Sequence, residues 1–307
     1  MSDIDAYLHR RRQMAALAVS AFAAGRNVVG TLIERFPDAK QDAIEIAYEL
    51  QAGAYTAGRD APAARAYRRE QHDLLIRKVL PLTAMDAGLS LLDAGTGEGT
   101  GWYGFDFAAT PVGDLHAVDI SLRRLGYVRR NIVYPSSMTL TPVRADLLAL
   151  PYHTRSFDLV VTMHAIEPNG GSEERIVETL AERSSNLLCL FEPDFASAEP
   201  AMQDRMKSLG YAERTFAAAR ALDDFDIVFE AQLENVTNPL NRTSVICLQR
   251  KHPSTGAVCW KSPAAGLDLD RHADHFAETG DGASAIYPVV GGIACLRQGD
   301  AVLRLGD

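Results

Sequence analysis

Cysteine is scarce in this 307-residue sequence, which contains only four. Cys189 and Cys247 lie inside apolar runs, where a thiol behaves as a small buried hydrophobe, and Cys259 and Cys295 stand far from them. Widely spaced, partly buried thiols are typical of a reducing compartment. We therefore expect the protein to be cytoplasmic.

Long apolar runs and an excess of positive charge are also missing. No stretch reaches the roughly 18 consecutive apolar residues that a membrane span requires. The 31 Lys and Arg residues are outnumbered by 40 Asp and Glu, which leaves a formal net charge of −9. Such a charge repels polyanions, so we expect no nucleic acid or membrane partner. The clustered arginines are expected on solvated helix faces: 10–12, 123, 124, 129 and 130.

The first 25 residues superficially resemble a secretion signal. Three arginines at 10–12 precede the apolar stretch 14–25, as in a charged and then apolar leader. Asp3 and Asp5 precede the arginines, however, and helical periodicity continues beyond residue 25. The pattern favours an amphipathic helix over a signal peptide.

Changes in apolar periodicity and composition divide the chain into three parts. Residues 1–80 show apolar positions at three- and four-residue spacing and predict a helical segment that closes over the next part. Residues 81–251 alternate short apolar runs with helical stretches, which indicates βαβ units. Residues 252–307 are rich in Pro, Gly and Asp and predict a small C-terminal module.

The middle part predicts an α/β fold with a doubly wound, seven-stranded Rossmann-like sheet. Five apolar runs are expected as parallel strands, and two longer runs joined at 238–241 are expected as an antiparallel hairpin that closes the sheet. The expected strands are 90–94, 115–119, 140–144, 157–163, 186–192, 225–236 and 243–250.

A glycine-rich turn follows the first expected strand. Residues 91–99, Leu-Leu-Asp-Ala-Gly-Thr-Gly-Glu-Gly, end an apolar run and begin a helix. Such a turn needs positive φ or a missing Cβ, and it lets a ligand approach the backbone closely. Alone, this pattern leaves open a dinucleotide site and a purely structural turn.

Aspartates stand at the ends of the next two expected strands. Asp119 lies where a carboxylate can accept hydrogen bonds from both ribose hydroxyls of a nucleoside. The alternative is a helix cap shared with Ser121. Asp146 is placed to hold the exocyclic amine of adenine while Leu147 lines the ring, and the alternative is a turn aspartate.

Together these motifs resemble the class I S-adenosylmethionine-dependent methyltransferases of the small-molecule type. The resemblance spans about residues 89–250 and rests on three motifs in the order and spacing of that family: D-x-G-x-G-x-G at 93–99, V-D-x-S at 118–121, and D-x-x-x-L-P with F-D-L-V between 146 and 160. It disfavours a dinucleotide site, where Asp93 and the Leu-Pro segment have no role.

This resemblance implies S-adenosylmethionine as cofactor. By it, Asp93, Gly95 and Gly97 surround the methionine part, Asp119 holds the ribose, and Asp146 with Leu147 holds the adenine. Thr96, Ile120 and His164 complete the expected cofactor-binding set.

The chain departs from the family around the fourth and fifth expected strands. Where many relatives carry a Pro-Gly-Gly turn, residues 181–186 read Ala-Glu-Arg-Ser-Ser-Asn. A dense polar segment at 164–171 supplies His164, Glu167 and Asn169 as candidate catalytic residues. His164 is a candidate general base, although it is equally suited to cap a helix or to pack beside the cofactor.

Further candidates flank this group. Glu167 and Asn169 could fix an ammonium or hydroxyl of the acceptor, and the carboxylates of Glu192 and Asp194 are expected to face the same crevice. Tyr55 lies in the segment that closes over the cofactor in such enzymes and is a candidate lid residue; packing in a core or linker is the alternative.

The C-terminal module contains residues 286–294, Ile-Tyr-Pro-Val-Val-Gly-Gly-Ile-Ala, which resemble the ending of small zinc-ribbon domains that accompany some methyltransferases. A ribbon needs four suitable ligands. Cys259, His272, His275 and Cys295 would supply them only at unusual spacing, so we expect no metal and a degenerate ribbon used for packing, dimerisation or lid support.

The sequence therefore predicts a methyltransferase that acts on nitrogen or oxygen of a small-molecule acceptor in a biosynthetic reaction. Two alternatives stay open: an enzyme that cyclises or cleaves S-adenosylmethionine itself, and a non-catalytic cofactor-binding or partner subunit. A homodimer is also left open, and the acceptor itself is not identified.

Overall fold

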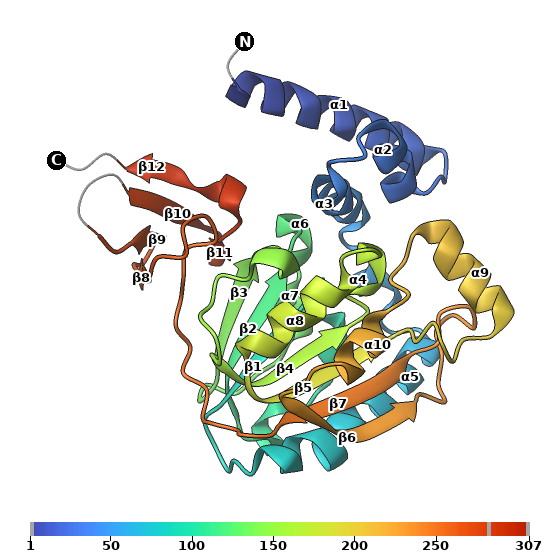
Figure 1. Ribbon diagram of the computed structural model, residues 1–307, viewed down its shortest axis with the longest axis vertical. Helices are drawn as coiled ribbons and strands as arrows, with labels where there is room; N and C mark the ends of the chain where they lie inside the picture. Colours follow the sequence, from blue (N-terminus) through green and yellow to red (C-terminus); the bar gives the residue numbers. More distant parts are fainter. Residues whose placement is uncertain (1–2, 281–283, 305–307) are drawn as a thin grey trace.

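A single large sheet organises the molecule (Figure 1). The computed structural model describes residues 3–280 and 284–304. The twelve strands follow the order β6-β7-β5-β4-β1-β2-β3-β11-β10-β9-β8, and β12 pairs with β10. Their bounds are β1 Leu89–Ala94, β2 Val112–Asp119, β3 Thr139–Arg144, β4 Phe157–Met163, β5 Ser184–Glu192, β6 Phe225–Gln232, β7 Ser244–Arg250, β8 Leu269–Arg271, β9 His275–Glu278, β10 Ser284–Val290, β11 Ile293–Cys295 and β12 Val302–Arg304.

The order of the strands fixes where a ligand binds. β1 pairs in parallel with β2 on one side and with β4 on the other, so the direction of winding reverses at β1. In open α/β sheets, ligands bind beyond the carboxyl ends of the strands at such a switch point. The predicted α/β fold is confirmed, and β6 with β7 forms the expected antiparallel closing pair.

The sheet does not stop at the seven expected strands. β11 adds to the edge of β3 in parallel, with Ala294 opposite Val143 and Cys295 opposite Arg144. The expectation of a separate C-terminal module missed this pairing because an edge strand carries free backbone donors and acceptors that any later segment can satisfy.

Helices cover both faces of the sheet and one end of it (Figure 1). α5 begins with Pro62 at a position where its missing N–H is not needed, and it continues through π and 3₁₀ turns to Thr83. The helices are α1 Asp3–Ala23, α2 Val28–Arg35, α3 Lys40–Gln51, α4 Ala54–Gly58, α5 Pro62–Leu74, α6 Leu122–Leu125, α7 Val128–Asn131, α8 Glu173–Arg183, α9 Pro200–Leu209 and α10 Thr215–Arg220.

The N-terminal helices form a small core of their own. Met14, Ala18 and Ala21 of α1 pack with Leu32 of α2 and Ala43 of α3. The short helix α4 follows α3, because Gly53 at φ 99° ends α3 and lets the chain restart as a helix. Among the described residues, no helix is both long and apolar enough to cross a membrane.

The main core lies on both faces of the sheet, because neighbouring residues of a strand point to opposite sides. Leu91 belongs to the cluster on one face and Leu92 to the cluster on the other. The segment without the Pro-Gly-Gly turn has no loop at all: α8 ends at Arg183 and β5 begins at Ser184.

Aromatic packing joins the C-terminal module to the sheet. The Trp260 ring lies 4.8 Å from those of Tyr152 and Phe276. Of the residues proposed as zinc ligands, Cys295 is buried in β11 and Cys259 is exposed. In the described parts of the chain, no three His, Cys, Asp or Glu side chains come together in a metal-binding group.

Candidate functional site

A cavity of about 530 Å³ lies beyond the carboxyl ends of the central strands. It collects eleven of the twelve residues that the sequence assigns to cofactor binding or catalysis: Tyr55, Asp93, Gly95, Thr96, Asp119, Ile120, Asp146, Leu147, His164, Glu167 and Asn169. The twelfth, Gly97, donates its N–H to the Asp119 carboxylate, 2.9 Å away. The three strand ends therefore meet in one place, as their spacing predicts.

The glycine loop is tied to β2 by its backbone. The N–H groups of Gly95 and Thr96 both donate to the carbonyl of Val118, at 2.8 and 2.7 Å. Gly95 has φ 86°, and a side-chain carbon there would overlap the Cβ of Ala165. Only glycine meets both conditions.

Asp93 is buried with one carboxylate oxygen left over. It is 1% exposed, and its Oδ2 accepts a hydrogen bond from Trp102 Nε1 at 2.7 Å. Its Oδ1 and the Thr96 hydroxyl make no hydrogen bond of ordinary geometry to any described residue. Burial raises the pKa of Asp93 to about 6, against the lowering effect of Thr96 and Trp102. A buried carboxylate without a full set of donors is suited to a cationic ligand.

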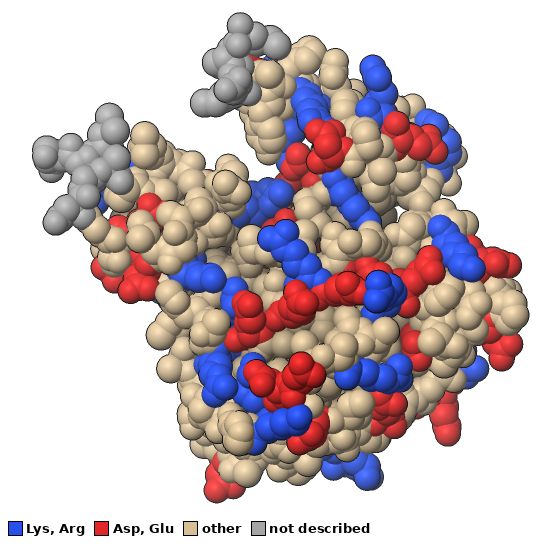
Figure 2. Space-filling model, in the orientation of Figure 1, with Lys and Arg blue, Asp and Glu red and all other residues tan. Residues whose placement is uncertain are grey.

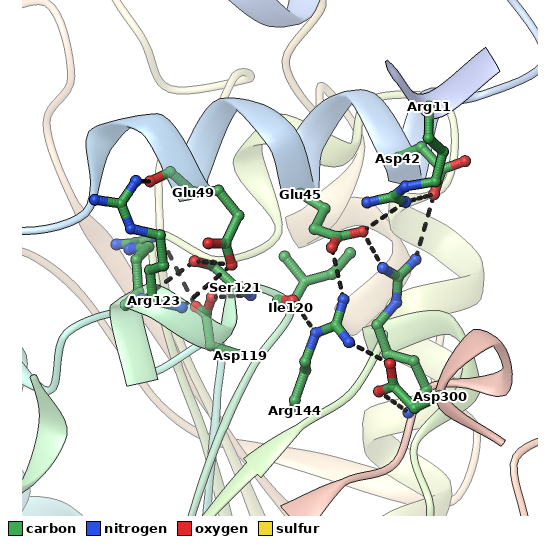
Figure 3. Close-up of polar contacts among 12 residues, drawn as sticks. Arg11, Asp42, Glu45, Glu49, Asp119, Ile120, Ser121, Arg123, Arg144 and Asp300 are labelled. Carbon is green, nitrogen blue, oxygen red and sulfur yellow. Dashed lines mark hydrogen bonds and ion pairs between the residues drawn. The ribbon is translucent and has the colours of Figure 1, made fainter. Parts of the chain in front are cut away.

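Asp119 holds the loop and faces the cavity. Its Oδ1 accepts from Ser121 N at 2.8 Å (Figure 3), and its Oδ2 accepts from Gly97 N at 2.9 Å. Each carboxylate oxygen has two lone pairs, so acceptor capacity remains. The helix cap weighed for this region is real, but Ser121 supplies it by accepting from Arg124 N.

Asp146 caps a turn and also lines the cavity. Its Oδ1 accepts from Leu148 N at 2.9 Å and caps a short 3₁₀ helix, so it is a turn aspartate. It also lines the cavity beside Leu147. Burial raises its pKa, while Arg297 is among the charges that lower it.

His164 is held in an unusual backbone conformation at the end of β4. Its φ is 56°, a left-handed value that few residues other than glycine adopt. Its Nδ1 lies 2.7 Å from Glu167 Oε2 and its Nε2 lies 2.6 Å from Thr243 Oγ1. Burial opposes its charge, but the carboxylates of Glu167 and Glu192 outweigh burial and raise the pKa of His164. Both ring nitrogens have partners, which weakens the hypothesis of a free general base.

Two expected residues do not face the cavity. The Glu192 carboxylate is fully buried and accepts the N–H groups of Ala165 and Ile166 at 2.8 and 3.2 Å. Burial raises its pKa to about 7. Asp194 is 8% exposed and accepts from Ala196 N at 3.1 Å. Neither lines the cavity, so the expectation of two further carboxylates in the crevice is wrong. Both carboxylates instead accept backbone N–H groups and so stabilise the loops around the site.

The remaining candidates, Asn169 and Tyr55, differ in how far their side chains are already engaged by the protein. Asn169 lines the cavity, but its amide donates to Ala165 O and accepts from Gln41 Nε2, so both ends are used. Tyr55 is half exposed, and its ring centroid lies 5.0 Å from the guanidinium carbon of Arg124. That geometry suits a residue at the mouth of the cavity.

Several lining residues escaped the sequence analysis. Arg124 lies between the rings of Tyr48 and Tyr55, at 4.6 and 5.0 Å, with 12% of its side chain exposed, so its expected place on a solvated face is wrong. Gln71 is 1% exposed, and neither end of its amide has a partner among the described residues. Both stand on amphipathic helices, where polar residues ordinarily indicate a solvated face.

Comparison with known proteins finds a family match for the central segment of the chain. Residues 91–186 match the family model described as a methyltransferase domain. The matched segment makes up less than a third of the chain. It contains the glycine loop, Asp119, Asp146 and His164, and it indicates S-adenosylmethionine as the cofactor. The family model ends before the C-terminal module, whose likeness to a zinc ribbon stays a prediction. No curated protein matches the chain in a sequence comparison.

Solved structures similar to this chain include two cofactor complexes. The N-methyltransferase NodS from Bradyrhizobium japonicum WM9, with S-adenosyl-L-homocysteine, has a TM-score of 0.50 and 15% identity, covering 66% of this chain and 95% of that chain. Magnesium protoporphyrin IX methyltransferase from Synechocystis PCC 6803, with bound SAM, has a TM-score of 0.47 and 15% identity, covering 69% and 97%. At 15% identity, the likeness to NodS shows the fold alone.

Proposed function

We propose that this protein transfers the methyl group of S-adenosylmethionine to a nitrogen of a small acceptor. The observation that carries the proposal is the meeting of Asp93, Asp119 and Asp146 in one cavity beyond adjacent strand ends. Each carboxylate suits a different part of the cofactor: its ammonium, its ribose hydroxyls and its adenine amine.

The residues present fit this cofactor. Asp93 has an unpartnered, buried carboxylate oxygen for the ammonium, and Gly95 lines the cavity without a side chain. Asp119 would hold the ribose, and Asp146 would hold the adenine amine between Leu147 and Ile120. When bound, the cofactor supplies an electrophilic methyl group on a sulfonium.

The other end of the cavity favours a nitrogen acceptor because it presents hydrogen-bond acceptors. Asn241 Nδ2 donates to Glu167 Oε2 at 3.1 Å. The carboxylate can only accept, so this contact fixes the orientation of the amide and leaves Asn241 Oδ1 free. That oxygen is buried and has no partner among the described residues. An amine has the N–H donors that these oxygens lack.

Two tyrosines, Tyr211 and Tyr48, also line the cavity. Burial first, and then the charge of Glu167, raise the pKa of Tyr211 to about 12. Burial first, and then the neighbouring Tyr55, likewise raise the pKa of Tyr48. Aromatic faces beside a carboxylate are suited to binding an ammonium.

Glu167 would take the acceptor's proton. An ammonium must lose a proton before its nitrogen lone pair can attack the methyl carbon; the C–S electron pair then stays on sulfur. His164 bonds to Glu167 through Nδ1 and to Thr243 through Nε2, and thus holds the carboxylate in place. We assign His164 a positioning role and Tyr55 the role of a lid that excludes water. Asn169 would orient the loop that presents Glu167.

Calorimetric titration with S-adenosylmethionine and S-adenosylhomocysteine, followed by mass spectrometry of the incubated cofactor with a panel of amines, tests the proposal. Micromolar-range binding and formation of S-adenosylhomocysteine only with an amine would support it. Methylthioadenosine formed without an acceptor would favour the cyclase or lyase alternative, and binding without any product would favour a non-catalytic subunit. The cytoplasmic location, the absence of a nucleic acid partner and the question of a homodimer stay predictions.

A further inference from the structure

The C-terminal module reaches the end of β3 that leads into the cofactor site. Cys295 of β11 lies opposite Arg144, the last residue of β3, and Leu296 N donates to Arg144 O at 2.8 Å. Leu296 is fully buried in the same cluster as Ala145. Asp146, the adenine candidate, follows directly. One wall of the cavity is thus attached to a segment about 150 residues later in the chain.

A buried carboxylate of α3 gathers arginines from three parts of the molecule (Figure 3). Glu45 is 3% exposed and pairs with Arg144 Nη2 at 2.6 Å, with Arg11 Nη1 at 3.0 Å, and with Arg297 of the C-terminal module. Burial opposes its charge, but the three guanidinium groups outweigh burial and lower the pKa of Glu45. Asp300 pairs with Arg144 from the other side.

The helix held by this network is a wall of the cavity. Ile44 and Tyr48, on either side of Glu45 in α3, both line it. One helical turn beyond Glu45, Glu49 accepts from Ser121 Oγ at 2.8 Å and from Arg123 N at 3.2 Å. α3 is therefore fastened to the loop that follows the ribose candidate Asp119.

Arg144 and Arg297 also interact with residues just beyond the ends of β2 and β3. Arg144 Nε donates to the carbonyl of Ile120 at 3.3 Å. Arg297 also lies 3.7 Å from Asp42 of α3, and its charge favours the ionised form of the half-buried Asp146. Ile120 and Asp146 would surround the adenosine half of the cofactor, and none of these contacts touches Asp93.

We infer that Arg297 and Asp300 are positioning residues for cofactor binding: through Glu45 and Arg144, the C-terminal module holds α3 and the end of β3 in the geometry that the adenosine half requires. The inference rests on the proposed cofactor site. It gives the module a role within the methyl-transfer site that the family model does not cover.

Arg297→Gln and Asp300→Asn test the inference in the full chain. We expect each to weaken binding of S-adenosylhomocysteine and of 5′-methylthioadenosine by the same factor, tenfold or more for Arg297→Gln. The two losses should match because methylthioadenosine lacks only the amino acid end, which the network does not reach. Arg304→Gln, an exposed arginine of β12 in the same module, removes the same charge and should change neither affinity.

Hydrogen exchange separates this inference from the cofactor proposal. In Arg297→Gln, the amides of α3 and of residues 119–123 should exchange at least tenfold faster than in the wild type, while those of β4 and β5 stay unchanged. If the wild type binds neither ligand, the cofactor assignment fails, and the exchange experiment still decides whether the module holds α3. Wild-type exchange in α3, or wild-type affinity in both variants, would overturn the inference.

Discussion

The carboxylates around the site differ in how many hydrogen-bond donors each one has, and this number indicates its role. Glu192 accepts three backbone N–H groups and folds a loop, whereas Asp93 receives one indole N–H and keeps an oxygen for a ligand. Glu167 is intermediate, because His164 and Asn241 hold it at the cavity surface. The number of partners, rather than burial alone, separates a structural carboxylate from a functional one.

Asp93 makes cofactor affinity depend on pH. Its pKa of about 6 means that the carboxylate is ionised above pH 6 and neutral below, so attraction for the cofactor ammonium is lost as the pH falls through 6. We expect the dissociation constant of S-adenosylhomocysteine to rise below pH 6. Asp93→Asn should weaken binding about 10- to 100-fold at pH 8, the effect of losing a bond to a charged group, and should flatten the profile. Calorimetry between pH 5 and 8 measures both.

The exposed Asp226 of β6 provides the control for that experiment. Asp226→Asn removes the same charge far from the glycine loop and should leave the profile of the wild type. If Asp93→Asn gives the same profile as Asp226→Asn, Asp93 does not bind the ammonium.

Glu167→Gln should reduce methyl transfer to an amine by about 100-fold or more, the usual contribution of a proton acceptor. The affinity for S-adenosylhomocysteine should stay within twofold of the wild type. Activity should recover partly at high pH, where the free amine needs no base. Steady-state rates between pH 7 and 10 check this, with Glu178→Gln on the exposed side of α8 as control. Loss of cofactor affinity in Glu167→Gln would show a structural role instead.

At the scale of elements, the junction of β1 with the glycine loop is the most constrained place in the site. Gly95 needs a positive φ, and it also lies against Ala165, which follows β4. The two neighbouring strand ends are thereby fixed at the distance that the cavity requires.

Gly95→Ala should therefore lower the free energy of unfolding by about 2–5 kcal/mol, the sum of backbone strain and overpacking. Gly104→Ala separates the two terms, because Gly104 has φ 82° with open space around it and should lose about 1 kcal/mol from strain alone. Urea unfolding of both variants measures the difference. Equal losses would show that contact with Ala165 does not constrain the loop.

Most of the elements could be predicted from the sequence because their signals are local. The run 157–163 is β4 as expected, and the expected strand 90–94 differs from β1 by one residue. The aspartates at or near the carboxyl ends of β1, β2 and β3 meet because parallel strands end at the same edge. The expected strand 225–236 was too long, since β6 ends at Gln232, where pairing with β7 stops at Ser244.

What the sequence did not reveal depends on contacts between distant segments. Arg11, Glu45 and Arg297 look like solvated charges, yet only 23%, 5% and 15% of their side chains are exposed, because they neutralise one another. The pairing of β11 with β3 has no sequence signal either, since strand pairing follows free backbone groups rather than side-chain type. The place of Arg124 in the cavity wall also depends on distant segments, because two tyrosines from the N-terminal helices cover it.

For the whole molecule, the three parts of the chain contribute to one site rather than forming separate bodies. The N-terminal helices supply Ile44, Tyr48 and Tyr55, the middle part supplies the strand ends, and the C-terminal module supplies Arg297 behind the wall. Figure 2 shows acidic and basic side chains interspersed over the face in view. Charge on that face is therefore balanced locally, within pairs and clusters.

The addition of β11 to β3 also sets an order of events during synthesis. The ribosome releases β3 about 150 residues before the segment that covers its open edge, and residues 89–250 have already emerged by then. In that interval the nascent sheet presents unpaired backbone to other chains, the situation in which edge-to-edge association competes with folding. Therefore β11, one of the last strands to be synthesised, is also the strand that covers this edge against neighbouring nascent chains.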